Sequence, residues 1–138
     1  MKSMVVGISE APTSHVAARA ALDLASSTGA TVHFVTAVGD SEAVVWKVGS
    51  DSFVLDTVES ARVAMKRIID GFGASVPFTV EAIEGHPAKA IITVAERESA
   101  DLIVVGNVRM QGIGRVLGSV GDDILRNAPC NVLIVKTV

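Results

Sequence analysis

Aromatic residues and cysteine are scarce in this sequence of 138 residues. Tyrosine is absent and aromatic residues make up 4% of the chain, which argues against the stacking platforms that bind single-stranded nucleic acids. Lys and Arg are scattered and the net charge is −3, so the basic footprint of a nucleic-acid binder is missing as well. We therefore expect no nucleic-acid partner. The one cysteine, Cys130, excludes a disulfide within the chain, and we interpret it as a small core residue.

Long hydrophobic runs are also missing. The longest apolar stretches are about as long as a strand, well short of the roughly 20 residues that cross a bilayer. The apolar segment after Met1 and Lys2 is too short for the core of a signal peptide. We expect a cytoplasmic protein without a membrane-spanning segment. Apolar residues nevertheless make up 49% of the chain, enough for one large core, and the length suits a single domain over residues 1–138.

Short apolar runs alternate with segments of helical periodicity. Strands are expected at 4–8, 31–38, 79–83, 102–106 and 131–135. The first helix should follow a cap at Thr13 or Ser14 and stop at Gly29. Residues 39–52 have a weak pattern and are expected to form a connection. A second helix should follow, with Val54, Val58, Ala61, Met65, Ile68 and Phe72 on its apolar face.

Two further helices complete the alternation. One opens at Pro87, in a first-turn position where the missing N–H costs nothing, and the other is short and covers 119–126. Because each connection between strands is long enough for a helix, we predict an α/β fold: an open, doubly wound, five-stranded parallel sheet with helices on both faces. Val5, Val35, Ile83, Val104 and Ile134 are expected to be buried in it.

A ligand crevice is expected beyond the carboxyl ends of these strands, where the strand order reverses. The loop after the first strand (Ile8, Ser9, Glu10), Val38 after the second and the glycine-rich stretch 106–119 after the fourth would line it. That stretch ends at the start of the short helix, where free N–H groups and the helix dipole favour an anion. The alternative is a plain loop whose glycines serve only turns.

Other site templates fit poorly. The spacing Gly112-x-Gly114-x-x-x-Gly118 imitates a dinucleotide fingerprint, but it lies some distance after its strand and lacks the acidic residue that would hold a ribose. A Walker-type lysine motif and a nucleophile elbow are both absent from the sequence. The three histidines are far apart in sequence and have no metal-ligand spacing to the cysteine. His33 lies within a predicted strand, where we expect a structural role.

The carboxyl-terminal stretch "VVGNVRMQGIGRVLGSVGDDILRNAPCNVLIVKT" closely resembles the signature of the universal stress protein family. "EGHPAKAIITVAERESADLIVVGN" and the opening "MVVGISEAPTSHVAARAALDLA" resemble the family's preceding segments, so the resemblance covers nearly the whole chain except 39–52. It implies a Rossmann-like or flavodoxin-like sheet of strand order 3-2-1-4-5. It also implies a homodimer and, in one branch of the family, a site for ATP or AMP.

The nucleotide signature of that branch is G-x2-G-x9-G-[ST]. Gly106 matches its first glycine, and Gly118 and Ser119 match its end. Arg109 stands at the second glycine and the following spacing is one residue short. Ser9 stands where nucleotide-binding members carry an aspartate. Arg109 either blocks the approach of phosphates to the loop or pairs with them through its guanidinium.

The resemblance implies binding of ATP or AMP, with Mg²⁺ accompanying ATP. Phosphates would lie near Gly118 and Ser119, the ribose near Gly106 and the adenine beside Val38. The full set of implied contact residues is Gly7, Ile8, Ser9, Val38, Val105, Gly106, Asn107, Arg109, Gly112, Gly118, Ser119 and Val120.

Three functions stay open. The first is a regulatory, stress-response module with a degenerate adenine-nucleotide site, which the surviving backbone donors favour. The second is a nucleotide-free dimeric protein that acts through a protein partner, which Ser9 and Arg109 favour. A slow ATP hydrolase is the weakest, because the crevice offers no obvious base, and we expect no enzyme. The homodimer should form through residues 131–138, an apolar strand at a sheet edge.

Overall fold

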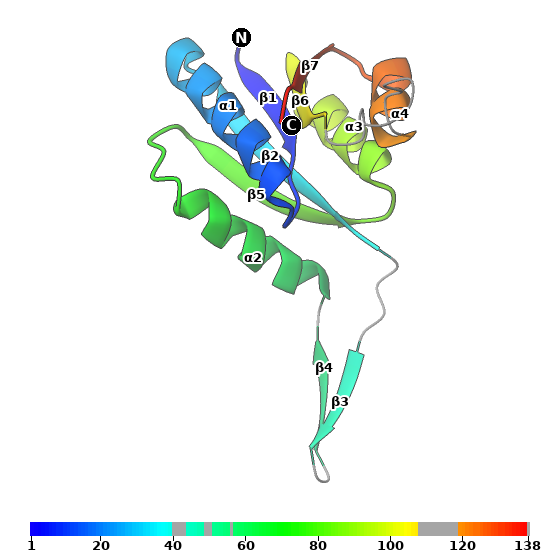
Figure 1. Ribbon diagram of the computed structural model, residues 1–138. Coiled ribbons are helices and arrows are strands. Elements are labelled where there is room, and N and C mark those ends of the chain that lie inside the picture. Colours follow the sequence, from blue (N-terminus) through cyan, green and yellow to red (C-terminus); the bar gives the residue numbers. More distant parts are fainter. Residues whose placement is uncertain (40–43, 49–50, 56, 108–118, 138) are drawn as a thin grey trace.

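The computed structural model describes residues 1–39, 44–48, 51–55, 57–107 and 119–137 (Figure 1). Its strands are β1 (Ser3–Gly7), β2 (Thr31–Val38), β3 (Val44–Val48), β4 (Asp51–Leu55), β5 (Phe78–Glu84), β6 (Leu102–Gly106) and β7 (Asn131–Val135). Its helices are α1 (Pro12–Thr28), α2 (Thr57–Asp70), α3 (Pro87–Arg97) and α4 (Ser119–Asn127). Strands and helices alternate along the chain, except where β3 and β4 follow β2.

Five of these strands form one parallel sheet in the order β5-β2-β1-β6-β7. β1 lies at its centre, where Val5 is the register partner of His33 on β2 and of Ile103 on β6. The start of β1 is also tied to the start of β6, because the carboxylate of Asp101 accepts the backbone N–H of Lys2 at 2.7 Å. Counted along the chain, the five strands have the order 3-2-1-4-5, so the predicted doubly wound sheet is confirmed.

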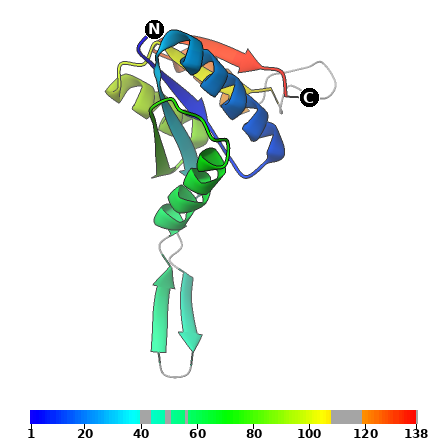
Figure 2. The same ribbon diagram turned by 90° about the vertical axis from the view of Figure 1, so that its left-hand side faces the viewer.

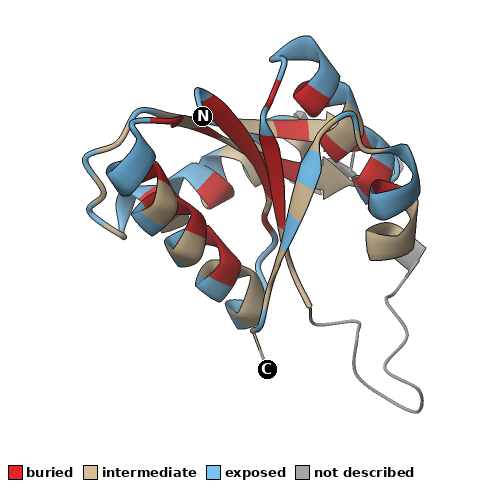
Figure 3. Cartoon of the chain, turned by 90° about the horizontal axis from the view of Figure 1, so that it is seen from above, coloured by how far each residue is buried: buried red, intermediate tan, exposed pale blue. Residues whose placement is uncertain are grey.

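Helices cover both faces of this sheet (Figure 1). Met4 and Val6 pack into a core shared with α1 and α2, whereas Val5, pointing the opposite way, packs into a core shared with α3 and α4. Figure 3 shows the buried residues gathered on the central strands and on the helix sides that face them. From β1 the chain first adds β2 and β5 on one side of the sheet, and then β6 and β7 on the other side. This reversal of the strand order leaves the crevice of a doubly wound fold at the carboxyl ends of β1 and β6.

Burial falls off from the centre of the sheet to its edges. Val5, Val35 and Val104 on the central strands are at most 1% exposed, as predicted. Ile83 and Ile134 are only partly buried, so the prediction of full burial was wrong for both. These two residues lie on β5 and β7, and an edge strand has a neighbouring strand on one side only.

A hairpin that the sequence analysis missed begins within the connection expected over 39–52 and continues to Leu55. β3 and β4 pair antiparallel, with Trp46 opposite Phe53 and Val45 opposite Val54. The hairpin projects from the body between β2 and α2 (Figures 1 and 2). Val54 therefore belongs to a strand, and α2 begins at Thr57. Val, Trp and Phe dominate these two segments, and such residues favour extended backbone.

The start of α1 also differs from the prediction. The helix begins at Pro12, after an N-cap at Ala11 that has no side-chain hydrogen bond, so neither Thr13 nor Ser14 is its cap. Proline suits this first position because the N–H it lacks would be unpaired anyway. α1, with 17 residues, is the longest helix in the described part of the chain, and no described helix is long and apolar enough to span a membrane.

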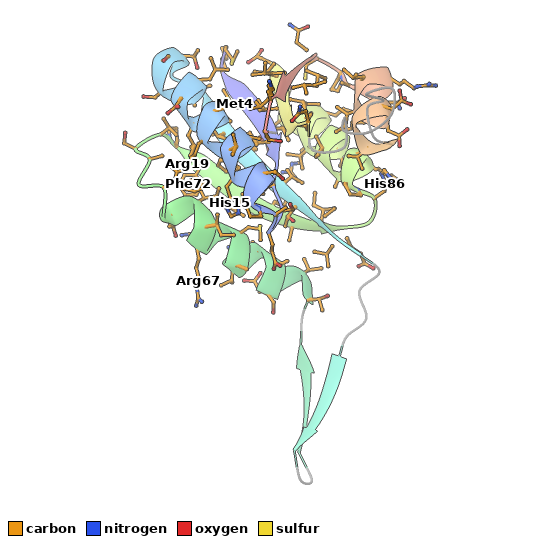
Figure 4. The ribbon with its side chains drawn as sticks, viewed as in Figure 1. Met4, His15, Arg19, Arg67, Phe72 and His86 are labelled. Carbon is orange, nitrogen blue, oxygen red and sulfur yellow. The ribbon has the colours of Figure 1, made fainter. Side chains whose placement is uncertain are left out.

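Cation–π and ring contacts join α1 to the segment that follows α2 (Figure 4). The guanidinium of Arg19 lies 4.6 Å from the ring centroid of Phe72, and the ring of His15 meets the same phenyl ring edge-on at 6.0 Å. The Nε2 atom of His15 is buried and has no hydrogen-bond partner among the described residues. Phe72 also packs against the core that α1 and α2 share with the sheet.

His33 and Cys130 both make contacts within the fold and lie outside the candidate site. The Nδ1 atom of His33 lies 2.8 Å from the hydroxyl of Thr79, which links β2 to β5. Cys130 is partly buried and packs against the core under α3 and α4. Burial raises the pKa of its thiol, helped by the negative charge of Asp101. Neither residue contributes to the cavity described below.

Candidate functional site

A cavity of about 250 Å³ lies at the carboxyl ends of β1, β2 and β6. The loop after β1 and the first turn of α1 close one side of it. Pro87 and Ile91 of α3 and Ile124 of α4 close the other side. The cavity thus occupies the crevice that the reversal between β1 and β6 creates.

Half of the sequence-derived contact residues come together around this cavity. Gly7, Ile8 and Ser9 line it from β1 and the following loop. Val105 and Gly106 line it from the end of β6, and Val120 lines it from α4. Three segments that are far apart in the sequence therefore meet at one opening. Their role as nucleotide contacts stays a prediction.

The remaining contact residues have other positions. Val38 and Asn107 are described, but neither lines the cavity. Arg109, Gly112 and Gly118 lie outside the described residues, as does the side chain of Ser119, whose backbone begins α4.

The loop after β1 is held by its own hydrogen bonds. The hydroxyl of Ser14 donates to the backbone carbonyl of Ser9 at 2.9 Å and accepts the N–H of Ser9 at 2.8 Å. The hydroxyl of Ser9 accepts the N–H of Ala11 at 3.3 Å. Ser14 thus fixes the loop before α1 instead of capping the helix. Ser9, the position for which the resemblance implies an aspartate in nucleotide-binding members, thus has a hydroxyl that is engaged with its own backbone.

Asn107 holds the chain beyond β7. Its side-chain oxygen accepts the backbone N–H of Thr137 at 2.7 Å and the hydroxyl of Thr137 at 2.9 Å. Its own N–H donates to the carbonyl of Val135. Thr137 lines the cavity, so Asn107 shapes one wall through Thr137 without facing the opening itself.

β2 contributes two residues that the sequence analysis did not name, Thr36 and Ala37. β1 pairs with β2 only as far as Val35, whose carbonyl accepts the N–H of Ile8. Ala37, two residues further on, directs its N–H and C=O to the same side, beyond the end of β1. Val38 points its carbonyl the other way, to the N–H of Gly85. The period of two along the strand thus directs the backbone groups of Ala37 toward the cavity, while the role of Val38 as an adenine contact stays a prediction.

Two glycines keep the walls of the cavity close together. A Cβ atom at Gly7 would lie 2.8 Å from Cδ1 of Ile91, and one at Gly106 would lie 3.0 Å from Cγ2 of Thr137. Both distances are shorter than ordinary carbon contacts. A side chain at either strand end would therefore make Ile91 or Thr137 shift and would change the walls of the cavity.

The described lining carries no charged side chain and is mostly apolar, with hydroxyl groups between the apolar residues. Val120 and Gly121 place the first turn of α4, and so the positive end of its dipole, at the opening. Asp122 in that turn pairs with Arg126 one turn later at 3.0 Å. In the described part of the chain, no three His, Cys, Asp or Glu side chains are grouped so that they could hold a metal ion. This chemistry suits a largely apolar ligand with an anionic group at the α4 end.

Known proteins resemble this chain along its length. It matches the universal stress protein family over residues 1–136. A universal stress protein of Methanocaldococcus jannaschii is 31% identical over 142 residues, covering 98% of this chain and 82% of that protein. One of Mycobacterium tuberculosis is 50% identical over 56 residues, 40% of this chain and 38% of that protein. A crystal structure of a universal stress protein in complex with cAMP has a TM-score of 0.80 and 27% identity, covering 99% of this chain and 98% of that one.

Proposed function

Because the chain belongs to the universal stress protein family, we propose that it is a regulatory module that holds an adenine nucleotide in the cavity at the ends of β1, β2 and β6. The observation that carries this proposal is the combination of an apolar opening with the first turn of α4 at its rim. Free N–H groups of a helix start bind phosphate, and the apolar walls suit a base. The relative in complex with cAMP supports a ligand of this class.

We propose one orientation of the ligand along the lining. Its phosphate lies at Val120 and Gly121, near Ser119, and its ribose lies near Gly106. Its adenine lies at the β2 side, beside Ala37, whose backbone N–H and C=O can pair with the edge of a base. We propose AMP or ATP, bound weakly, with Mg²⁺ held by the phosphates when ATP is the ligand.

We propose that the site binds the nucleotide without catalysing its hydrolysis. The described lining residues include no carboxylate and no histidine that could position a water molecule as a general base. Glu10, the acid in the first loop, is outside that lining. Any ATP hydrolysis should therefore be slow.

A nucleotide-free protein that works through a protein partner is the second candidate. It is favoured by Ser9, whose hydroxyl is engaged with the backbone of its own loop, and by Arg109 in place of a glycine. Both candidates share a proposed homodimer through residues 131–138. Leu133 in this edge strand is 40% exposed, and an apolar edge with unpaired backbone groups favours pairing with a second copy.

Substitutions of Arg109 distinguish the nucleotide-binding candidate from the nucleotide-free one. If its guanidinium pairs with the phosphates, Arg109→Ala weakens AMP binding by about 1.5–3 kcal/mol, the scale of a hydrogen bond to a charged group, and added salt reduces the loss. Titration calorimetry on nucleotide-stripped protein measures this. Arg109→Gly rebuilds the family's glycine. Wild-type protein that binds no nucleotide at millimolar concentration, together with an Arg109→Gly variant that does bind, would show that Arg109 plugs the site.

A further inference from the structure

Thr36 is a buried hydroxyl residue whose polar group has no assigned task. It lies near the end of β2, is 7% exposed and lines the cavity. The hydroxyls of Ser14 and Thr137, which line the same cavity, are engaged in hydrogen bonds within the chain. Among the described residues, none forms a hydrogen bond with the hydroxyl of Thr36. In the described part of the chain, the one enclosed side-chain polar atom without a partner is Nε2 of His15, so the hydroxyl of Thr36 is not sealed in the core and stays accessible to a partner from outside the chain.

The position of Thr36 shows which end of a ligand it would meet. β2 and β6 flank β1, so the residues of β2 lie about 10 Å across the sheet from those of β6. The first turn of α4, which follows β6 in the chain and lines the opposite side, forms the end for the phosphate. Thr36 and Ala37 line the cavity from β2, two strands away from β6, and form the other end.

We propose that the hydroxyl of Thr36 hydrogen-bonds the base of the bound nucleotide and is a specificity-determining group of the site. This inference rests on the proposed function. A hydroxyl both donates and accepts, so it can pair with an amino group or a ring nitrogen of a purine. In the free protein the hydroxyl has no hydrogen-bond partner in the described part of the chain, and the ligand supplies one.

Removing the hydroxyl of Thr36 should weaken the binding of the nucleotide without destabilising the fold. Thr36→Val replaces the hydroxyl by a methyl group of similar size and removes the unpaired polar group. The variant should unfold at the same temperature as the wild type or at a higher one, while its affinity for AMP falls about three- to tenfold. Its affinity for adenosine should fall by the same factor, since the phosphate is not involved. Thr36→Ser keeps the hydroxyl and should keep most of the affinity.

Titration calorimetry with AMP and with adenosine, and thermal unfolding without ligand, test this on the full chain. Thr93→Val, at an exposed position on α3 outside the cavity, is the matched control and should change neither affinity. Wild-type protein that binds neither ligand overturns the proposed function itself. Wild-type protein that binds both, with a Thr36→Val variant of equal affinity, overturns only the role of Thr36. A loss for AMP without a loss for adenosine, or a lower unfolding temperature of the variant, also overturns that role.

Discussion

The two edges of the parallel sheet differ in chemistry. At the β5 edge, Glu81 receives two hydrogen bonds from the guanidinium of Arg97, at 3.0 and 2.6 Å, and Thr79 is exposed beside it. At the β7 edge, Leu133 is 40% exposed and its neighbours Val132 and Ile134 are only partly buried. A charged edge resists pairing with another sheet, whereas an apolar edge favours it. The comparison favours β7 over β5 as the edge of the proposed homodimer.

Placing a charge on the β7 edge should have the largest effect. Leu133→Lys puts an ammonium group where a partner strand would lie, so we expect the homodimer to dissociate to monomers at micromolar concentration. Light scattering coupled to size-exclusion chromatography measures the mass. Val63→Lys is the matched control, because Val63 is 36% exposed and lies on α2, which packs beside β5. Equal masses for wild type and Leu133→Lys would mean that β7 is not the interface.

Loosening the chain beyond β7 should have an intermediate effect. Asn107→Ala removes the acceptor of two hydrogen bonds from Thr137 and leaves a partly buried N–H without its partner. We expect the free energy of unfolding in urea to fall by about 1–2 kcal/mol at fixed protein concentration. Thr137→Val removes only the hydroxyl bond and should cost less than half as much. A loss in Asn107→Ala no larger than in Thr137→Val would show that the backbone N–H finds another acceptor.

Removing the charge at the β5 edge should have the smallest effect. The hydrogen bonds from Arg97 lower the pKa of Glu81, so the pair stabilises the fold at neutral pH and loses this contribution as pH falls through the lowered pKa. The Glu81 side chain is 36% exposed, so we expect Glu81→Gln to cost at most about 1 kcal/mol at pH 7.

The difference between wild type and Glu81→Gln should vanish in acid, where the carboxyl of Glu81 is protonated in the folded and unfolded states alike. Urea unfolding at several pH values measures this. Asp70→Asn, which breaks the exposed pair with Lys66 on α2, is the control and should cost less. A difference that persists in acid would rule out the ion pair as its cause.

The sequence pattern predicts the parallel sheet well because its signals are local. β2 and β6 have the predicted bounds, since each is an apolar run that ends at a glycine or just before one, and Pro87 correctly marks the start of α3. The sequence also contains a signal for the hairpin formed by β3 and β4. Gly49 and Ser50 separate two runs rich in strand-forming residues, and a two-residue Gly-Ser connection is typical of a hairpin.

The details of the site depend on contacts that sequence spacing does not contain. The choice between Val38 and Ala37 follows from where β1 ends relative to β2, which is a matter of sheet register. The side chain of Asn107 turns to Thr137 because β7 lies beside β6. Thr36 looks like an ordinary strand residue until the cavity around it is known.

The central position of β1 has a consequence for the synthesis of the protein. β1 is translated first, but its neighbour β6 comes about a hundred residues later, roughly 5–20 s at usual elongation rates. During that interval one edge of β1, with the apolar side chains of Met4, Val5 and Val6, has no strand to pair with. Contacts so distant along the chain form slowly and leave the nascent chain prone to aggregation. The sheet therefore cannot be completed around β1 until residues 101–106 have emerged from the ribosome.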